Sequence, residues 1–132
     1  MSSNDLIYMS AAEIADNIKE KQISPVEVVR AYLDRIEAVD SKVNAYITVM
    51  ADDALDAARQ SEADVIAGSI KGPLHGVPVG VKDQIYTNGT RTSCASKIRA
   101  DFVPDFDATV VIGLKRSGAI ILGKLNMTEF AM

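Results

Sequence analysis

Two short apolar runs joined by one amphipathic segment constrain the fold of this chain more than any other feature. Residues 77–81 alternate valine with proline or glycine, and residues 119–122 form the continuous apolar run Ala-Ile-Ile-Leu. Between them the pattern predicts a helix over 108–117, with Asp107 as its N-cap and Gly118 after its end. A continuous apolar run is typical of a strand buried on both faces. We therefore expect a right-handed β-α-β unit with two parallel strands, which predicts an α/β layer fold.

Helices and one further strand are expected ahead of this unit. Ser10 and Ser24 each stand three residues before a glutamate, which is the capping-box pattern of a helix N-terminus. Pro25 follows Ser24, and proline is favoured at the first position of a helix. The sequence thus predicts helices that begin after Ser10 and Ser24, a short strand over 45–49 and an Ala-rich helix over 51–67.

Length and composition bound the class of protein. The 132 residues suffice for one domain with a core and are too few for two ordinary domains, so residues 1–132 are expected to form a single unit. With 48% hydrophobic and 24% charged residues, the composition is that of a soluble globular protein. The formal net charge is -4, which provides no basic patch, so we expect no direct binding of nucleic acid by this chain.

The cysteine and histidine content points to a cytoplasmic chain without a metal. Cys94 is the single cysteine and cannot form an intramolecular disulfide, which suits a reducing compartment. The first eight residues lack the pattern of a signal peptide, and no apolar stretch approaches the roughly 20 residues that span a bilayer. His75 is the only histidine, so no zinc site, and no cofactor, is expected.

Lys82 is the main candidate for chemistry. It directly follows the strand expected over 77–81, and ligand sites of open α/β sheets form at the carboxyl ends of strands. A lysine that acts as a base must have its pKa lowered from about 10.4 by burial or by a neighbouring cation. Asp83 could either stabilise the charged form of Lys82 or orient the following loop. From spacing alone, a surface lysine at a strand end remains the simpler interpretation.

A long connection between Lys82 and Asp107 holds further candidates. Structureless loops of this length are uncommon in compact domains unless they are functional or disordered. Ser93 or Ser96 could act as a nucleophile in a Ser-Lys dyad, or could simply stabilise turns. Cys94 is interpreted as a small buried or loop residue. His75, between two glycines in the turn ahead of the strand, is interpreted as a turn residue.

Several ordered blocks of this sequence resemble the amidase signature family. The segment Gly-Pro-Leu-His-Gly-Val-Pro-Val-Gly-Val-Lys-Asp, residues 72–83, is similar to the lysine motif of that family. Within the family, residues 94–97 and 129–132 are most similar to the A subunits of tRNA-dependent glutamyl/aspartyl amidotransferases. The similarity covers nearly the whole chain, and its further blocks are residues 91–98, 107–111, 117–124 and 126–132.

The resemblance implies a function and a fold. Family members hydrolyse amides with a Ser-Ser-Lys triad, and the lysine of that triad matches Lys82. The Gly/Ser-rich block that carries both serines is expected beyond Met132, so the 132 residues alone are expected to be inactive. The implied fold is a set of N-terminal helices plus part of a mixed sheet, so that 1–132 is a single partial domain. The implied substrate is an amide such as glutamine, with ammonia passed to an amidotransferase partner subunit that uses ATP.

Two expectations concern the assembly of the chain. The alternative to an amidase is a free-standing, non-catalytic α/β module for binding or assembly. In either case the apolar strand over 119–122 needs a neighbouring strand and covering helices, which we expect to lie outside these residues. Residues 126–132 are expected to be the first turns of a helix. We therefore expect self-association through residues 119–132, because an unpaired apolar strand is a template for association.

Overall fold

The computed structural model describes residues 3–132 and confirms the α/β class. Five α-helices and three strands are connected by loops that include two single 3₁₀ turns within the described residues. In chain order they are α1 (Ser3–Leu6), α2 (Ala11–Lys19), α3 (Pro25–Val43), β1 (Tyr46–Val49), α4 (Ala51–Ile66), β2 (Pro78–Lys82), η1 (Lys97–Arg99), α5 (Thr109–Arg116), β3 (Ile120–Leu125) and η2 (Glu129–Ala131).

The three strands form one mixed sheet in the order β1-β3-β2. β2 and β3 are parallel and are joined through α5, so the expected β-α-β unit is confirmed. β1 pairs with the other edge of β3 in the antiparallel direction. The expectation that the neighbour of the 119–122 strand lies outside these residues is therefore wrong. β3 also extends to Leu125, because its pairing with both neighbours continues past the apolar run.

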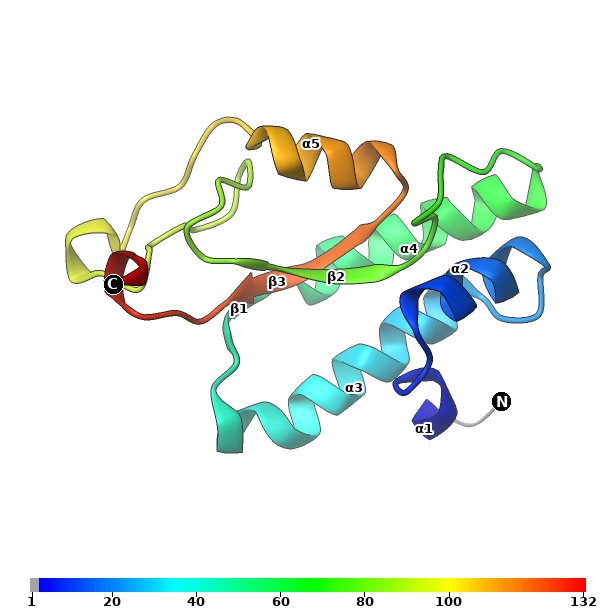
Figure 1. Ribbon diagram of the computed structural model, residues 1–132, viewed down its shortest axis with the longest axis horizontal. Helices are drawn as coiled ribbons and strands as arrows, with labels where there is room; N and C mark the ends of the chain where they lie inside the picture. Colours follow the sequence, from blue (N-terminus) through cyan, green and yellow to red (C-terminus); the bar gives the residue numbers. More distant parts are fainter. Residues whose placement is uncertain (1–2) are drawn as a thin grey trace.

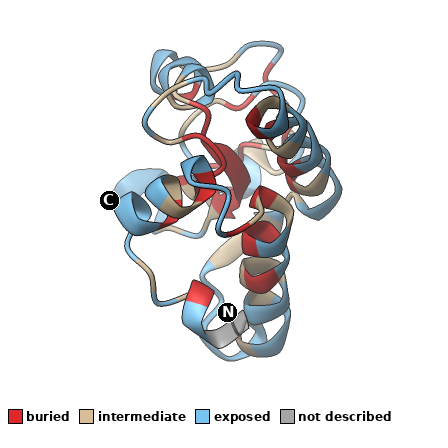
Figure 2. Ribbon diagram, turned by 90° about the vertical axis from the view of Figure 1, so that its right-hand side faces the viewer, coloured by how far each residue is buried: buried red, intermediate tan, exposed pale blue. Residues whose placement is uncertain are grey.

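Helices cover both faces of this sheet. Figure 1 shows α5 on one side and α3 on the opposite side, with α4 behind the strands. Ile120 and Leu122 of β3 pack against α3 and α4, where Val29, Ala54 and Ala58 are almost fully buried. Figure 2 shows that the buried residues gather in the sheet and on the helix sides that face it. The sheet is thus the centre of the fold, as the apolar run at 119–122 predicted, but the expectation that its covering helices lie outside these residues is wrong.

The starts of α2 and α3 follow the predicted capping boxes. Ser10 accepts a hydrogen bond from the Glu13 amide while Glu13 accepts one from the Ser10 amide, and Ser24 and Glu27 repeat the pattern. The Ser24 hydroxyl also donates to Glu62 of α4, which ties the beginning of α3 to the neighbouring helix.

The predicted N-cap of α5 is wrong. Ala108 occupies the N-cap position and makes no side-chain cap hydrogen bond. Asp107 instead accepts hydrogen bonds from the Asn88 amide (2.7 Å) and the Lys115 ammonium (2.6 Å). The carboxylate therefore joins the long loop to the last turn of α5, and the chain enters the helix one residue later than the pattern predicted.

The helix expected over 126–132 is also wrong. Only the 3₁₀ turn η2 forms there, and Phe130 inside it has a φ of 49°, outside helical geometry. The Asn126 side chain donates to the Asn44 carbonyl, and the Phe130 amide donates to the Cys94 carbonyl. In a helix the Phe130 amide would bond to a carbonyl of its own segment. Here it bonds to a distant residue, so the segment does not continue as a helix.

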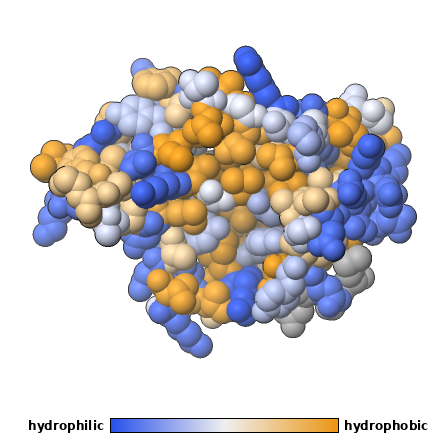
Figure 3. Space-filling view, in the orientation of Figure 1, coloured by the Kyte–Doolittle hydropathy of each residue, from blue (hydrophilic) through white to orange (hydrophobic). Residues whose placement is uncertain are grey.

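The surface over β2 is apolar. β2 pairs with β3 on one side, and within the described residues its other edge carries no strand. Figure 3 shows apolar surface across the middle of the face on which β2 lies in Figure 1, between α5 and α3. Among the described residues no helix has the length and apolar character needed to cross a membrane.

Candidate functional site

Lys82 is the last residue of β2, at the carboxyl end predicted from the sequence. Its neighbour across the sheet is Leu125, whose carbonyl accepts a hydrogen bond from the Asp83 amide (3.0 Å). The Lys82 carbonyl in turn accepts one from the Ile85 amide (2.9 Å), which closes a tight turn. The backbone on both sides of Lys82 is therefore fixed, while the residue itself is exposed.

Asp83 orients the loop that follows Lys82. It is 1% exposed, and its Oδ2 atom accepts hydrogen bonds from the Ser93 hydroxyl (2.6 Å) and the Ser93 amide (3.0 Å). The Asp83 carbonyl accepts a further bond from the Cys94 amide (3.2 Å). Of the two roles open for Asp83 from sequence, these contacts support the orientation of the loop.

Lys124 is a second lysine at this site, and sequence reasoning missed it. It lies on β3 and is fully buried, at 0% exposure. Its Nζ atom donates to the Ile85 carbonyl and to the Thr92 hydroxyl, both at 2.7 Å, and lies 3.7 Å from Asp83 Oδ1. Desolvation lowers the pKa of Lys124, although the nearby Asp83 carboxylate acts in the opposite direction.

A sequence signal for Lys124 does exist. The residue comes two positions after the apolar run at 119–122, and only Gly123 separates them. A strand that ends at the glycine would leave the lysine in a loop, whereas a strand that continues through the glycine carries it inside. A lysine that continues the run of a central strand must be buried, and a buried ammonium needs acceptors.

The hydroxyl groups of Ser93 and Ser96 both bond to carboxylates. Ser93 donates to Asp83, and Ser96 donates to Glu129 Oε1 (2.6 Å). Figure 1 accordingly shows the C-terminal turn beside the yellow turn near residue 97. Between the two serines, Cys94 and Ala95 both have positive φ values, 54° and 52°. This geometry favours the structural interpretation of both serines over a role as nucleophile.

His75 and Cys94 are both buried. His75 Nδ1 accepts a hydrogen bond from the Lys71 amide (3.2 Å), so its Nε2 carries the proton that reaches the Ser61 carbonyl (3.0 Å). The imidazole thereby attaches the turn ahead of β2 to α4. Cys94 is a free thiol. Within residues 3–132 no cluster of three or more histidine, cysteine or acidic side chains could hold a metal ion.

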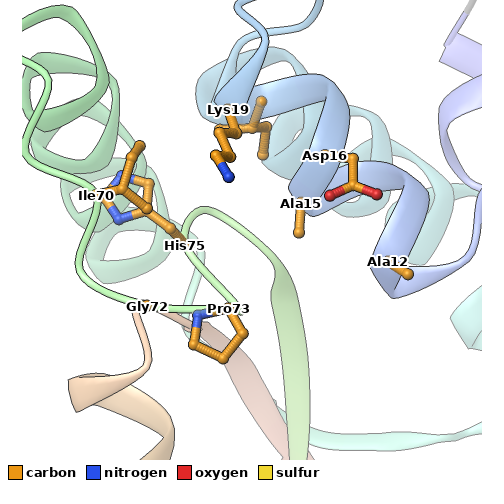
Figure 4. Close-up of a pocket in the computed structure, with 9 residues that line it drawn as sticks. Ala12, Ala15, Asp16, Lys19, Ile70, Gly72, Pro73 and His75 are labelled. Atoms are coloured by element: carbon orange, nitrogen blue, oxygen red, sulfur yellow. The ribbon is translucent and has the colours of Figure 1, made fainter.

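A hollow of about 470 Å³ lies beside His75. Figure 4 shows it between α2 and the turn of residues 70–75, with the Lys19 ammonium and the Asp16 carboxylate at its rim. Its other lining residues are mostly small or apolar, namely Ala12, Ala15, Ile18, Ile70, Gly72 and Pro73. Lys82 does not line this hollow. The hollow is therefore not a binding site for a substrate on which Lys82 acts.

The chain matches a family model and curated proteins along nearly its whole length. The family model described as Amidase matches residues 27–132. The A subunit of the glutamyl-tRNA(Gln) amidotransferase of Moorella thermoacetica is 51% identical over 128 residues, which are 97% of this chain and 26% of that protein. The same subunit of Carboxydothermus hydrogenoformans is 50% identical, with the same coverage. The chain thus spans about a quarter of the length of the curated relatives it matches.

Solved structures share the fold over a similar portion. The peptide amidase of Stenotrophomonas maltophilia is 32% identical, with a TM-score of 0.88 over 93% of this chain and 26% of that one. A bacterial aryl acylamidase of the amidase signature family is 30% identical, with a TM-score of 0.87 and the same two coverages. A fatty acid amide hydrolase has a TM-score of 0.90 over 96% of this chain and 22% of that one, but at 23% identity it supports the fold alone.

Proposed function

Since this chain belongs to the amidase family, we propose that it forms the N-terminal part of an amide-hydrolysing enzyme and supplies the lysine of the catalytic triad, Lys82. In this proposal residues 1–132 are a single partial domain of the complete enzyme. Both triad serines lie in a Gly/Ser-rich block outside these residues. The three-stranded sheet and the helices that cover it therefore hold Lys82 for chemistry that other segments complete.

The proposed role of Lys82 is proton transfer. One serine attacks the carbonyl carbon of the amide, and its proton passes through the second serine to the Lys82 amine. The proton then returns to the leaving nitrogen, the C–N bond breaks and ammonia departs from a primary amide. Water hydrolyses the remaining acyl-enzyme by the reverse path. No metal or cofactor is required by these steps.

One observation carries the proposal. Lys82 stands at the carboxyl end of β2 with its backbone bonded on both sides, and the residue is left open to solvent. A proton-transfer group must be held on a rigid element while its amine stays accessible to the partner residue. In this proposal the desolvation that a lysine base requires comes from the segments that carry the serines. An ordinary surface lysine on a loop would lack the first property, and a structural lysine such as Lys124 lacks the second.

The relatives suggest a more specific activity. Because proteins about 50% identical to this chain are A subunits of glutamyl-tRNA(Gln) amidotransferases, we extend the proposal to glutamine as the amide substrate. The ammonia would pass to a partner subunit that uses ATP and modifies aminoacyl-tRNA. This chain itself would not bind the tRNA. The proposed location is the cytoplasm, in keeping with the single cysteine.

The test is a chimeric enzyme. The 128 residues of this chain that match the Moorella thermoacetica relative replace the corresponding quarter of that protein, and ammonia release from glutamine is measured with the other subunits of that enzyme. The unsubstituted chimera should be active. Lys82→Ala should reduce kcat by about 10³-fold or more, as expected for a triad member. Lys97→Ala, at an exposed lysine of the following loop, is the matched control and should keep the full rate.

Two outcomes contradict the proposal. A folded chimera that keeps most of its activity after Lys82→Ala removes Lys82 from the triad. A chimera with native circular dichroism but no activity, beside an active parent enzyme, supports a non-catalytic module. The 132-residue polypeptide by itself should release no ammonia from glutamine, asparagine or aryl amides. Turnover by that polypeptide that disappears after Ser93→Ala would restore the Ser-Lys dyad.

A further inference from the structure

We infer that Lys124 is a positioning residue for Lys82: its buried ammonium fixes the turn that follows Lys82 to the central strand of the sheet. The inference rests on the proposed role of Lys82 and adds a second residue to that site. The hydrogen bonds of Lys124 go to the loop after Lys82 and not to the Lys82 side chain, so its role is exerted through the backbone.

The anchor point of Lys124 is the most restrained strand of the sheet. β3 pairs with β1 on one side and with β2 on the other. In the register of the parallel pair, Lys124 stands opposite Val81, one residue before Lys82. The side chain therefore starts from a backbone that is hydrogen-bonded along both edges, directly beside the end of β2.

The ammonium joins two separate parts of the loop. One bond goes to the Ile85 carbonyl in the turn after Lys82, and another goes to the Thr92 hydroxyl on the returning segment. The Ile85 amide closes the same turn by donating to the Lys82 carbonyl. Removal of the ammonium would release the turn and the returning segment together, because both are bonded to the same atom.

Asp83 completes the arrangement from the other side. Its Oδ2 atom holds Ser93, while its Oδ1 atom is buried without a hydrogen-bond partner and has the Lys124 ammonium 3.7 Å away. Asp83 is also the residue that follows Lys82. Asp83 therefore connects the charge of Lys124 to the peptide unit that directly follows the proposed catalytic lysine.

The burial of the Lys124–Asp83 ion pair supports a role beyond stability. Two fully buried charges are costly to desolvate, and a buried ion pair is often no more stable than apolar residues of the same size. Such costs are typical of sites in which geometry serves function. Here the costly pair lies directly under the turn after Lys82, and not in the apolar core formed by β3, α3 and α4.

The first experiment measures the turn itself in the 132-residue chain. Thr92→Val keeps the side-chain shape and removes one acceptor of Lys124, and Lys124→Met removes the ammonium. In both variants hydrogen exchange of the Ile85, Ser93 and Cys94 amides should accelerate by about tenfold or more, and by more than that of the Val29 amide of α3, whose exchange follows global stability. Thr90→Val is the matched control, because the Thr90 hydroxyl contacts a methionine sulfur at 3.7 Å and not the ammonium.

The second experiment measures catalysis in the chimeric enzyme. Thr92→Val and Lys124→Met should lower kcat for glutamine by about tenfold and about a hundredfold, because small misplacements of a reacting group are costly. KM should change by less than about twofold, since neither residue is proposed to contact the substrate. Thr90→Val should leave both constants at the unsubstituted value. A variant that is merely less stable would keep the unsubstituted kcat at a temperature where circular dichroism shows it to be folded, whereas a misplaced turn lowers kcat there as well.

The outcomes separate this inference from the proposed function. If Lys82→Ala abolishes activity while Thr92→Val accelerates exchange without changing kcat, Lys124 is structural and the inference is overturned. If the three amides exchange freely in the unsubstituted chain, no positioning exists and the inference also fails. If Lys82→Ala leaves activity intact, the proposed function fails, and Lys124 cannot position a catalytic group.

Discussion

At the scale of single residues, two lysines at the same edge of the sheet have opposite environments. Lys82 is exposed, and its ammonium can remain hydrated. Lys124 is fully buried, and its ammonium is surrounded by protein acceptors and the Asp83 carboxylate. A residue whose charge is hydrated can be removed at little cost, whereas removal of a buried charge leaves its partner uncompensated. The two positions therefore predict very different mutational effects.

Lys82→Ala should change the free energy of unfolding by less than about 0.5 kcal/mol, as is usual for surface substitutions. Lys124→Met should destabilise the chain by about 3 kcal/mol, because Asp83 then keeps a buried charge without a cation. Urea unfolding of the two variants and the unsubstituted chain measures both values. A loss above about 2 kcal/mol for Lys82→Ala would show that Lys82 is a structural ion-pair residue.

Asp107 predicts a pH-dependent contribution to stability. Desolvation raises the pKa of its carboxyl group, but the hydrogen bonds from Lys115 and from the Asn88 amide outweigh it, so the pKa is lowered from 3.8. A lowered folded-state pKa stabilises the protein above the unfolded pKa, and this stabilisation is lost as the pH falls through the folded value. Asp107→Asn should thus cost about 1 kcal/mol at pH 7.

The difference in the free energy of unfolding between the unsubstituted chain and Asp107→Asn should then shrink as the pH falls below about 3.8. Urea unfolding midpoints, measured at steps from about pH 7 to about pH 3, report this difference. Asp105→Asn, at an exposed neighbouring carboxylate, is the control and should give little difference at any of these values. A cost of Asp107→Asn that is independent of pH would show that the carboxylate charge is not what Lys115 and Asn88 recognise.

At the scale of elements, local signals predicted most of the helices and strands. The capping boxes at Ser10 and Ser24 and the apolar run at 119–122 act over a few residues, so they are visible in the sequence. The predictions of the α5 N-cap and of the 126–132 helix were wrong because distant segments bond to the polar groups that these features would have used. Asp107 bonds to the loop and to Lys115, and the Phe130 amide bonds to Cys94, and neither partner follows from spacing.

The candidate site shows the same division. The position of Lys82 at a strand end could be predicted, because alternation ends there and the Gly/Pro-rich approach is local. The burial of Lys124 has a signal in the preceding apolar run, but spacing does not decide it, because the continuation of β3 past Gly123 depends on pairing with β1 and β2, both far along the chain. That pairing extends the strand past Gly123 and carries the lysine into the interior.

Gly123 predicts a sharp contrast between two glycines. It lies where β3 is closely paired with β1, and an added Cβ atom would be 2.3 Å from the Thr48 carbonyl oxygen. Gly123→Ala should therefore destabilise the chain by about 2 kcal/mol or more, because backbone must shift. Gly113 lies within α5 and has nothing within 4 Å of the same position. Gly113→Ala should stabilise by about 0.5–1 kcal/mol through helix propensity.

Thermal unfolding of both glycine variants measures this contrast. The parallel pairing of β2 with β3 should survive in Gly113→Ala. The β3 amides of this variant should therefore keep the hydrogen-exchange protection of the unsubstituted chain. If Gly123→Ala is as stable as the unsubstituted chain, β1 does not pair with β3 as described, and the burial of Lys124 loses its structural basis.

At the scale of the whole molecule, the sheet formed by residues 3–132 has a fully paired central strand and two outer strands that each pair on one side. β3 has a neighbour on each side, so an unpaired strand over 119–122 cannot be the cause of self-association through 119–132. The large exposed apolar side chains of that segment are confined to its end, where Phe130 is 42% and Met132 is 93% exposed. The edge of β2 is a second candidate, because it borders the apolar surface in Figure 3.

The isolated 132-residue chain should therefore still self-associate, with the edge of β2 as the main contact. An unpaired strand edge that is bordered by apolar surface is a template for pairing with another chain. A lysine substituted into such an edge strand opposes this pairing. Light scattering across a dilution series should show a rising mass with concentration. Val79→Lys in β2 should abolish the rise, whereas Ile66→Lys on α4, where the residue is 72% exposed, should leave it unchanged.

The double variant Phe130→Ser, Met132→Ser separates the two candidate contacts. If it abolishes association while Val79→Lys does not, the contact lies in 119–132 as the sequence predicted, and it acts through side chains rather than strand edges. If association stays unchanged in both, neither surface is responsible. A constant monomer mass across the dilution series would contradict self-association altogether, and would mean that the helices and the long loop already shield the open edge of β2.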